Sequence, residues 1–233
     1  MLWLKKYTES VVDLLYPHLC PGCGNDLVQR DIQLCIYCLS DLPHTSFALY
    51  ADNPVEKLFS GRLKVQAAHS EFYFTKSELI QKLLHQLKYK GNKQIGHFLG
   101  TIIGASLLES KRFTDLDFII PLPLHPKKQF RRGYNQAAVI GEGISAVLKI
   151  PMLEKCVIKT ISTETQTKKN RIKRWQNVSE SFSITDHQII NGKRILLVDD
   201  VITTGATIEA CGNVILTIPR TKLSVVSVAY ASK

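Results

Sequence analysis

The 233-residue sequence predicts an α/β protein in which a mostly parallel sheet is flanked by helices and preceded by a small cysteine-rich segment. Three observations carry this prediction. Strand-like apolar runs alternate with helical segments over residues 118–231, an order typical of parallel strands covered on both faces. The run Ile195–Val198 is apolar at every position and is followed by two acids. Four of the six cysteines form two C-x2-C pairs within residues 20–38.

The N-terminal part is expected to form a separate domain over residues 1–45, made of an amphipathic helix and a four-cysteine zinc-binding unit similar to a double zinc ribbon. Charged residues interrupt the apolar ones in the first seventeen positions, which favours an amphipathic helix over a signal peptide. No apolar run is long enough to span a bilayer. We therefore expect a cytoplasmic protein without a transmembrane segment, with residues 46–233 forming the second domain.

The four cysteines of this segment are candidate ligands of a structural Zn²⁺. Two tight C-x2-C turns can place four thiolates tetrahedrally around one ion. Two disulfides are the first alternative, which the absence of a secretion signal disfavours. A redox C-x2-C is the second, although such a motif normally stands alone beside a βαβ unit. The predicted metal ligands are Cys20, Cys23, Cys35 and Cys38.

The first half of the second domain predicts a strand or hairpin and then two helices. Residues 65–74 alternate in polarity and suit the edge of the main sheet. A helical apolar stripe begins after Ser77, and Gly91-Asn92 ends it. A second helix over 93–109 carries glycine at every fourth position, which predicts close packing of that helix on the sheet.

The second half continues the alternation. Because ligands of such sheets lie beyond the carboxyl ends of the strands, the basic and acidic segments that leave those ends predict one shared pocket. Cys156 and Cys211 are expected to be small core residues. Strands are predicted at 118–124, 152–159, 193–200 and 223–231, and helices at 135–148 and from about 207 to 216.

Residues 195–207, ILLVDDVITTGAT, combine an anion site with a pair of carboxylates. A small-residue turn that opens a helix presents unpaired amides and hydroxyls to an anion, and the helix dipole favours negative charge there. The adjacent Asp199 and Asp200 would repel phosphate, but they suit vicinal hydroxyls or a cation such as Mg²⁺. Together these groups indicate a ribose 5-phosphate ligand. The alternative is an acid-ended strand in an ordinary Rossmann-like domain.

This segment resembles the thirteen-residue fingerprint of the type I phosphoribosyltransferases. The resemblance implies that family's fold and a site for phosphoribosyl pyrophosphate (PRPP) with Mg²⁺, with the acids on the ribose hydroxyls and the loop on the 5-phosphate. Members that act on 6-oxopurines have an acid where Thr203 stands, so purine salvage is not implied. The residues implied to bind PRPP are Asp199, Asp200, Val201, Thr203, Thr204, Gly205, Ala206 and Thr207.

A broader resemblance covers nearly the whole chain. A short helix, the segment CPGCGNDL…LCIYCLSDLP and then a phosphoribosyltransferase domain form a layout similar to that of the ComF family. The likeness continues through HQLKYKGNKQIGHFLG at 85–100, IIPLPLHPKKQFRRGYNQA at 119–137 and QTKKNRIKRWQNVSESF at 166–182. The family includes a competence-associated DNA-uptake protein and a relative linked to gluconate utilisation. The resemblance implies a part in processing incoming DNA during transformation.

The net charge of +10 is concentrated in two stretches without acids, residues 118–141 and 165–179. Each could be only a solvated surface loop. Their places in the predicted fold instead suit a pyrophosphate loop and the family's flexible loop, which closes over PRPP. His125 is expected to make one backbone hydrogen bond, and Tyr134 either to stack on a base or to pack at the core edge. The candidate residues are Lys127, Lys128, Arg131, Arg132 and Gly133 in the first, and Lys168, Lys169, Arg171, Lys173 and Arg174 in the second.

Three classes of function remain open from the sequence. A phosphoribosyltransferase would transfer the ribose 5-phosphate of PRPP to an acceptor that the sequence does not identify. A non-catalytic module would sense PRPP or bind single-stranded DNA or another nucleic acid through its basic loops. A purely structural adaptor would leave the ligand loop without a purpose. The zinc ribbon could read the acceptor or bind a protein partner in the DNA-uptake machinery.

Overall fold

The computed structural model describes residues 18–26, 33–74, 78–159 and 182–231. Its main sheet has four parallel strands in the order β1-β6-β5-β2. These strands are β1 (Ala68–Tyr73), β2 (Phe118–Pro121), β5 (Arg194–Ile202) and β6 (Lys222–Tyr230). β1 lies at one edge, as predicted. The helices are α2 (Ile36–Ser40), α3 (Pro54–Phe59), α4 (Glu78–Tyr89), α5 (Lys93–Glu109), α6 (Pro126–Arg132), α7 (Gln136–Leu148), α9 (His187–Ile190) and α10 (Ala206–Leu216).

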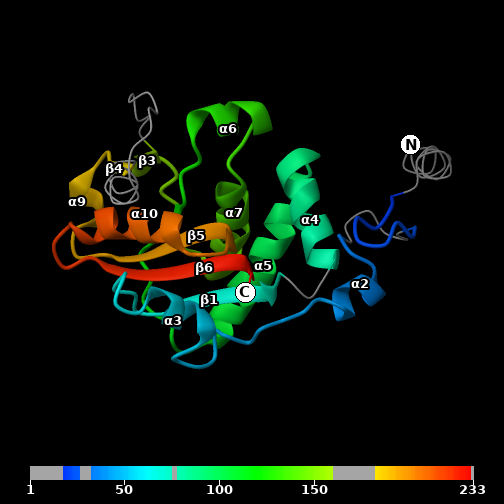
Figure 1. Cartoon of the computed structure of the whole chain (residues 1–233), viewed down its shortest axis with the longest axis horizontal. Coiled ribbons are helices and arrows are strands. Elements are labelled where there is room, and N and C mark those ends of the chain that lie inside the picture. The colour runs from blue at the N-terminus through cyan, green and yellow to red at the C-terminus, as the bar shows by residue number, and fades with distance from the viewer. Residues whose placement is uncertain (1–17, 27–32, 75–77, 160–181, 232–233) are drawn as a thin grey trace, which may run out of the picture.

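Helices cover both faces of the sheet, as the apolar run in β5 predicted (Figure 1). Leu196 and Val198 belong to the core cluster that also contains the buried side chains of α4, α5 and α7. Ile195 and Leu197 belong to the opposite cluster, with α3 and α10. Side chains alternate across a strand, so a run that is apolar at every position supplies both clusters. The predicted fold class is therefore confirmed.

The glycine repeat of α5 packs against α7 rather than on the sheet. A Cβ added at Gly100 would lie 2.1 Å from the carbonyl oxygen of Ile140, and one added at Gly143 would lie 2.2 Å from that of His97. The backbones of α5 and α7 therefore touch where each helix has a glycine. The predicted close packing is present, but the predicted partner, the sheet, was wrong. The spacing of glycines shows which side of a helix allows close approach, but not which element packs there.

Several predicted segments have different bounds or partners. The strand predicted over 152–159 is not part of the main sheet. Met152 makes one isolated bridge to Ile119, and β3 (Val157–Lys159) pairs antiparallel with β4 (Phe182–Ile184). The strand predicted over 118–124 ends at Pro121, and the basic loop after it contains α6. α3 was not predicted. The N-terminal helix predicted before residue 18 lies outside the described residues.

Within the described ranges, no helix combines the length and the apolar character that crossing a bilayer would require.

Candidate ligand pocket and four-cysteine cluster

The acid pair lies inside β5 and not after it, because the strand continues to Ile202. β2 pairs with β5 only as far as Pro121 opposite Val198. Beyond that point β5 keeps β6 as its neighbour, with Asp199 opposite Ser227. The chain that leaves β2 diverges there, and a cavity of about 270 Å³ opens between the two segments. Its lining includes Asp199, Asp200 and Val201 from β5 and the residues that follow β2.

The two carboxylates differ in their surroundings. Burial, and next the charge of Asp200, raise the pKa of Asp199 to about 8. The backbone N–H of Asp200 donates to Asp199 Oδ1 over 2.8 Å, which favours the ionised form and opposes that rise. Asp200 Oδ2 lies 2.9 Å from Lys88 Nζ in an ion pair. The cavity therefore holds one carboxylate neutralised by a lysine and one whose ionisation is costly.

Cations reach the cavity from three separate segments. Lys88 comes from α4, Lys128 and Arg132 come from α6, and Lys159 comes from the end of β3. Burial, and next the charge of Lys128, lower the pKa of Lys159. Positive groups crowded against one another at a partly buried cavity favour an anionic ligand. The single pocket expected from the sequence thus brings acids and cations together.

α6 is fixed at its ends and has no buried residue of its own. His125 caps its N-terminus, where Nδ1 accepts from the Lys127 N–H over 3.2 Å, as expected of this residue. Gly133 ends the helix in the left-handed conformation with φ of 78°. Lys128 and Arg132, one turn apart, line the cavity, whereas Lys127, Arg131 and Gly133 are not among its lining residues.

The segment after α6 anchors the helix to the core and completes the cavity wall. Asn135 caps α7 and donates to the carbonyl of Leu122 over 3.0 Å. The Tyr134 hydroxyl donates to the carbonyl of Leu87 and the ring packs against the core, so Tyr134 takes the packing role of the two expected. Arg132 Nη1 donates to Gln136 Oε1 over 2.7 Å. Arg132 Nε and Gln136 Nε2 are buried donors with no hydrogen-bond partner among the described residues.

The predicted phosphate loop follows β5 and opens α10. Gly205 takes φ of 71° and precedes the helix without a side-chain cap. A Cβ on Gly205 would lie 2.8 Å from Phe59 Cε1, so α3 closes against the loop. Thr207 lines the cavity, while Thr203, Thr204, Gly205 and Ala206 are not among its lining residues. Of the five predicted loop residues, the structure therefore places only Thr207 in the lining of this cavity.

Four residues at or near the pocket were missed by sequence reasoning. Arg62 Nη1 donates to the carbonyl of Thr204 over 3.1 Å and pairs with the buried Glu209, which holds the loop on α10. Gln136, Lys88 and Lys159 line the cavity. Lys88 stands in the HQLKYKGN segment, where its helical position gave no sign of a partner 112 residues away in sequence. The basic residues predicted for the flexible loop, from Lys168 to Arg174, lie outside the described residues.

The four predicted metal ligands are brought together. The sulfur atoms of Cys20, Cys23, Cys35 and Cys38 all lie within 4.8 Å of one another, and none forms a disulfide. Four sulfur ligands 2.3 Å from one Zn²⁺ would lie roughly 3.8 Å apart, and Cys23 Sγ is 3.6 Å from Cys35 Sγ. This four-cysteine cluster could therefore hold a metal ion.

Backbone N–H groups point at the sulfur atoms of the cluster. The Cys35 N–H donates to Cys20 Sγ over 3.4 Å, and the Cys38 N–H donates to Cys35 Sγ over 3.5 Å. Burial raises the pKa of Cys20, but the backbone N–H groups, that of Cys35 foremost, outweigh burial and lower it to about 6. Burial, and next the neighbouring Cys35, raise the pKa of Cys38. Thiolates are the metal-binding form of cysteine, so these two shifts point in opposite directions, and the gathering of the four sulfur atoms is what suits a metal site.

The fold and the site define an α/β protein that gathers an acid pair and several cations at the carboxyl edge of a parallel sheet, beside a four-cysteine cluster. No protein-family model matches the chain. Over 195 residues it is 31% identical to Competence protein F of Haemophilus influenzae, and the alignment covers 82% of this chain and 81% of the relative. The chain therefore belongs to the competence protein F family, as its ComF-like layout predicted.

Other relatives match shorter parts of the chain. DNA utilization protein YhgH of Escherichia coli is 29% identical over 140 residues, which cover 59% of this chain and 61% of the relative. Competence protein ComFC of Bacillus subtilis is 26% identical over 61% of this chain and 56% of its own. Among solved structures, a B. subtilis glutamine PRPP amidotransferase aligns with a TM-score of 0.43 and 18% identity, over 61% of this chain and 30% of that chain. A likeness of that size carries no functional conclusion.

Proposed function

We propose that this protein binds PRPP with Mg²⁺ in the cavity beside β5 and transfers the ribose 5-phosphate to an acceptor. The observation that supports the proposal is the meeting in one cavity of the acid pair with Lys128 and Arg132. PRPP carries vicinal hydroxyls at its centre and phosphates at its two ends. A site for it therefore needs carboxylates between two anion-binding walls.

Each wall has a role in this proposal. Asp199 and Asp200 accept hydrogen bonds from the ribose hydroxyls, and the loop from Thr203 to Thr207 receives the 5-phosphate. Lys128 and Arg132 face the pyrophosphate, where the buried Nε of Arg132 would gain an acceptor. An arginine can bind two phosphate oxygens at once, while a lysine supplies a point charge.

The acid pair also supplies the oxygen ligands that Mg²⁺ prefers. Bound there with PRPP, Mg²⁺ would supply positive charge next to the phosphate oxygens. In the transfer itself, the bond between C1 of the ribose and the pyrophosphate oxygen breaks, and that oxygen keeps both electrons. A lone pair of the acceptor forms the new bond to C1, and the proton that the acceptor carried at that atom passes to solvent water. Lys128 and Arg132 stabilise the charge that collects on the departing pyrophosphate.

Calorimetric titration of PRPP with Mg²⁺ into the metal-loaded protein tests the proposal. The variant Asp199→Asn/Asp200→Asn should abolish binding, and Asp115→Asn, which changes an exposed aspartate of an ion pair with Arg194, should not. A pyrophosphate-release screen over candidate acceptors then separates a transferase from a PRPP sensor. If the folded wild-type protein fails to bind PRPP, the proposal is wrong.

We further propose that the four-cysteine cluster holds a structural Zn²⁺, as its all-sulfur ligand set suits. Elemental analysis of the purified protein should give one zinc per chain. The variant Cys38→Ser should lose that zinc, while Cys211→Ser, which changes a buried cysteine of α10, should retain it. Zinc that persists in the Cys38 variant would contradict the assignment.

A second candidate function, binding of single-stranded DNA, is favoured by the outer surface of α6. Phe130 is 92% exposed in a helix that carries four cations and no acid. At the adjoining end of α4, Tyr89 is 61% exposed and its ring lies 5.4 Å from the Arg132 guanidinium. Exposed aromatic rings among cations suit unpaired bases and phosphates. This function could coexist with PRPP binding, which would use the other side of α6.

Fluorescence anisotropy with a labelled oligothymidine tests this second candidate. Phe130→Ala should weaken binding about tenfold, in line with the cost of losing one stacked base. The control Leu108→Ala removes a side chain that is 68% exposed on α5 and should change nothing. Affinity should fall steeply with salt. Equal affinity of the wild type and the Phe130 variant would exclude the stacking role.

A further inference from the structure

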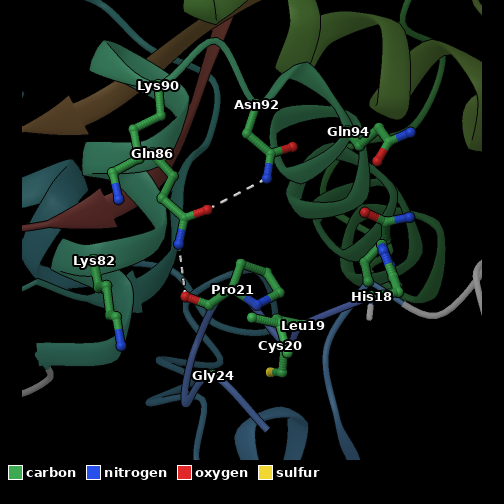
Figure 2. A pocket seen from close by; sticks show the side chains of 11 residues that line it. His18, Leu19, Cys20, Pro21, Gly24, Lys82, Gln86, Lys90, Asn92 and Gln94 are labelled. Atoms are coloured by element: carbon green, nitrogen blue, oxygen red, sulfur yellow. Dashed lines mark hydrogen bonds between the residues drawn. The ribbon is translucent and has the colours of Figure 1, made fainter. Parts of the chain in front are cut away.

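The cysteine cluster is attached to the same helix that delivers Lys88 to the acid pair. α4 lies between the two sites, and one side of it faces a groove against the cluster (Figure 2). The other side carries Lys88, which pairs with Asp200. We infer that the four-cysteine cluster acts, through α4, as a positioning element for Lys88 in the ligand pocket. This inference rests on the proposed function for the identity of the ligand, but not for the position of Lys88.

Two side chains of α4 donate hydrogen bonds to backbone carbonyls in the first C-x2-C turn of the cluster. Gln86 Nε2 donates to the carbonyl of Pro21 over 2.7 Å, which Figure 2 shows as a dashed line. Lys82 Nζ donates to the carbonyl of Gly22. Both carbonyls lie between the ligands Cys20 and Cys23, so metal binding would fix the acceptors of both bonds. Lys82 and Gln86 are one turn apart and share one side of α4.

The backbone of this turn also packs tightly against α4. A Cβ added at Gly22 would lie 2.6 Å from Cys38 Sγ and 2.7 Å from Leu79 Cδ1. The first turn of the cluster is therefore held between its own ligand and the start of the helix. Because there is no room for even a methyl group at Gly22, a displacement of the cluster would be transmitted to α4.

The position of Lys88 follows from the geometry of the helix. Gln86 and Lys88 are two residues apart, so their side chains point roughly 200° apart around the axis. The buried side chains of Leu83, Leu84 and Leu87 hold a third side of α4 on the core. The apolar contact anchors the helix, while the hydrogen bonds from the cluster limit its rotation. Rotation that released Gln86 would carry Lys88 away from Asp200.

The same helix also supports the segment between α6 and α7, whose neighbours Arg132 and Gln136 line the cavity. The carbonyl of Leu87 accepts from the Tyr134 hydroxyl, and Tyr134 directly precedes the cap of α7. A shift of α4 would therefore alter the support of Arg132 and Gln136 as well as the pair of Lys88 with Asp200. Lys82 and Gln86 are thus positioning residues, and neither contacts the acid pair directly in the described structure.

The test has two separate readouts, the reactivity of Lys88 and the affinity for PRPP, and both use the full metal-loaded chain. The first readout is the rate at which an amine-reactive ester labels Lys88, measured by mass spectrometry relative to the exposed Lys111. Gln86→Ala removes the bond to the Pro21 carbonyl together with the one that Gln86 Oε1 accepts from Asn92 Nδ2. It should raise that rate about fivefold, the factor expected for the bond to Pro21. The matched control is Gln81→Ala, which removes a hydrogen bond from the same helix to the carbonyl of Phe74, away from the cluster. It should leave the rate unchanged.

Removal of the metal by a chelator should raise Lys88 labelling to a similar extent, and Gln86→Ala should add little to that effect. If Gln86→Ala does not fold, Lys82→Met gives the same comparison with the aliphatic stem retained. Unchanged Lys88 labelling in the folded variant, or an equal response to Gln81→Ala, would overturn the inference.

The second readout is the affinity for PRPP with Mg²⁺. Gln86→Ala should weaken binding about fivefold in the wild-type background and clearly less in the Lys88→Met background, where only the support of Arg132 through Leu87 and Tyr134 is still altered. Equal weakening in both backgrounds would mean that the effect does not pass through Lys88, and the inference would be wrong. If the wild type does not bind PRPP but Lys88 labelling responds as expected, the positioning role stands and the proposed ligand is wrong.

Discussion

The substitution Asp199→Asn should stabilise the ligand-free protein while it abolishes PRPP binding. The pKa of Asp199 is raised to about 8 because burial and the neighbouring Asp200 disfavour its charge. In an unfolded chain an aspartate titrates near 3.8. The folded state therefore binds a proton more tightly than the unfolded state does. Between these two values the stability of the wild type falls as the pH rises, and above about 8 the whole penalty is present.

The size of this effect can be bounded. A difference of about four pKa units corresponds to at most roughly 6 kcal/mol at 1.36 kcal/mol per unit. Asp199 retains some solvent exposure, and the pKa of the pair belongs partly to Asp200. We therefore expect a gain of about 1–2 kcal/mol in the free energy of unfolding of Asp199→Asn at pH 8.5, and a smaller gain at pH 5.

Urea denaturation followed by circular dichroism at pH 5, 7 and 8.5, without Mg²⁺, measures this difference. Asp115→Asn serves as the control, since Asp115 is 73% exposed in its ion pair with Arg194. The gain should increase with pH only for the Asp199 variant. An Asp199 variant that is less stable than the wild type at every pH, or whose difference does not change with pH, would refute the reasoning.

Three further predictions concern other residues. Glu71 is buried between His44 Nδ1 at 2.7 Å and His69 Nε2 at 2.8 Å; burial opposes its charge, but these partners lower its pKa to about 2. Glu71→Gln should therefore lower the free energy of unfolding by about 2 kcal/mol at pH 7. The difference in stability between the wild type and the variant should shrink as the pH falls from about 4.5 toward 2. Denaturation across that pH range measures it. Gly205→Ala should cost more than Gly133→Ala in the same assay, because both positions have positive φ but only Gly205 would also bring a Cβ against Phe59; the backbone cost alone is about 1 kcal/mol. Gly100→Ala should lower the melting temperature more than either, since its Cβ would displace α7, and an unchanged melting temperature would contradict the close contact of α5 and α7.

The extent to which the sequence predicted the fold depended on how local each signal was. The α5 helix was predicted with its observed bounds, and the residues that cap it, Asn92 and Ser110, directly flank it in the sequence. The strand predicted at 152–159 was wrong in its partner, since β3 pairs with β4 across a long intervening segment and nothing within the run specifies that pairing. The helix α6 was missed because none of its residues is buried, so it has no apolar periodicity to detect.

The same distinction applies to the candidate site. The acid pair, Thr207 and the cations of α6 were predicted because each stands in a contiguous motif. Lys88 and Lys159 were not, because only the folded chain brings α4 and the end of β3 to β5. Arg62 likewise reaches the loop at Thr204 from a position 142 residues away. Residues that complete a pocket from distant segments leave no local pattern in a single sequence.

Of these missed residues, Lys88 has a role in the ligand-free state through its ion pair with Asp200. Burial, and next repulsion by the adjacent Asp200, raise the pKa of Asp199. Lys88 supplies a cation to the pair at 2.9 Å. Binding of Mg²⁺ with PRPP at these acids would bring a second cation to a place that Lys88 already occupies, so metal binding there is an exchange of partners. The freed ammonium would then lie beside the anionic ligand. A lysine in this place would lower the affinity for Mg²⁺ alone and favour Mg²⁺ that arrives with its phosphates.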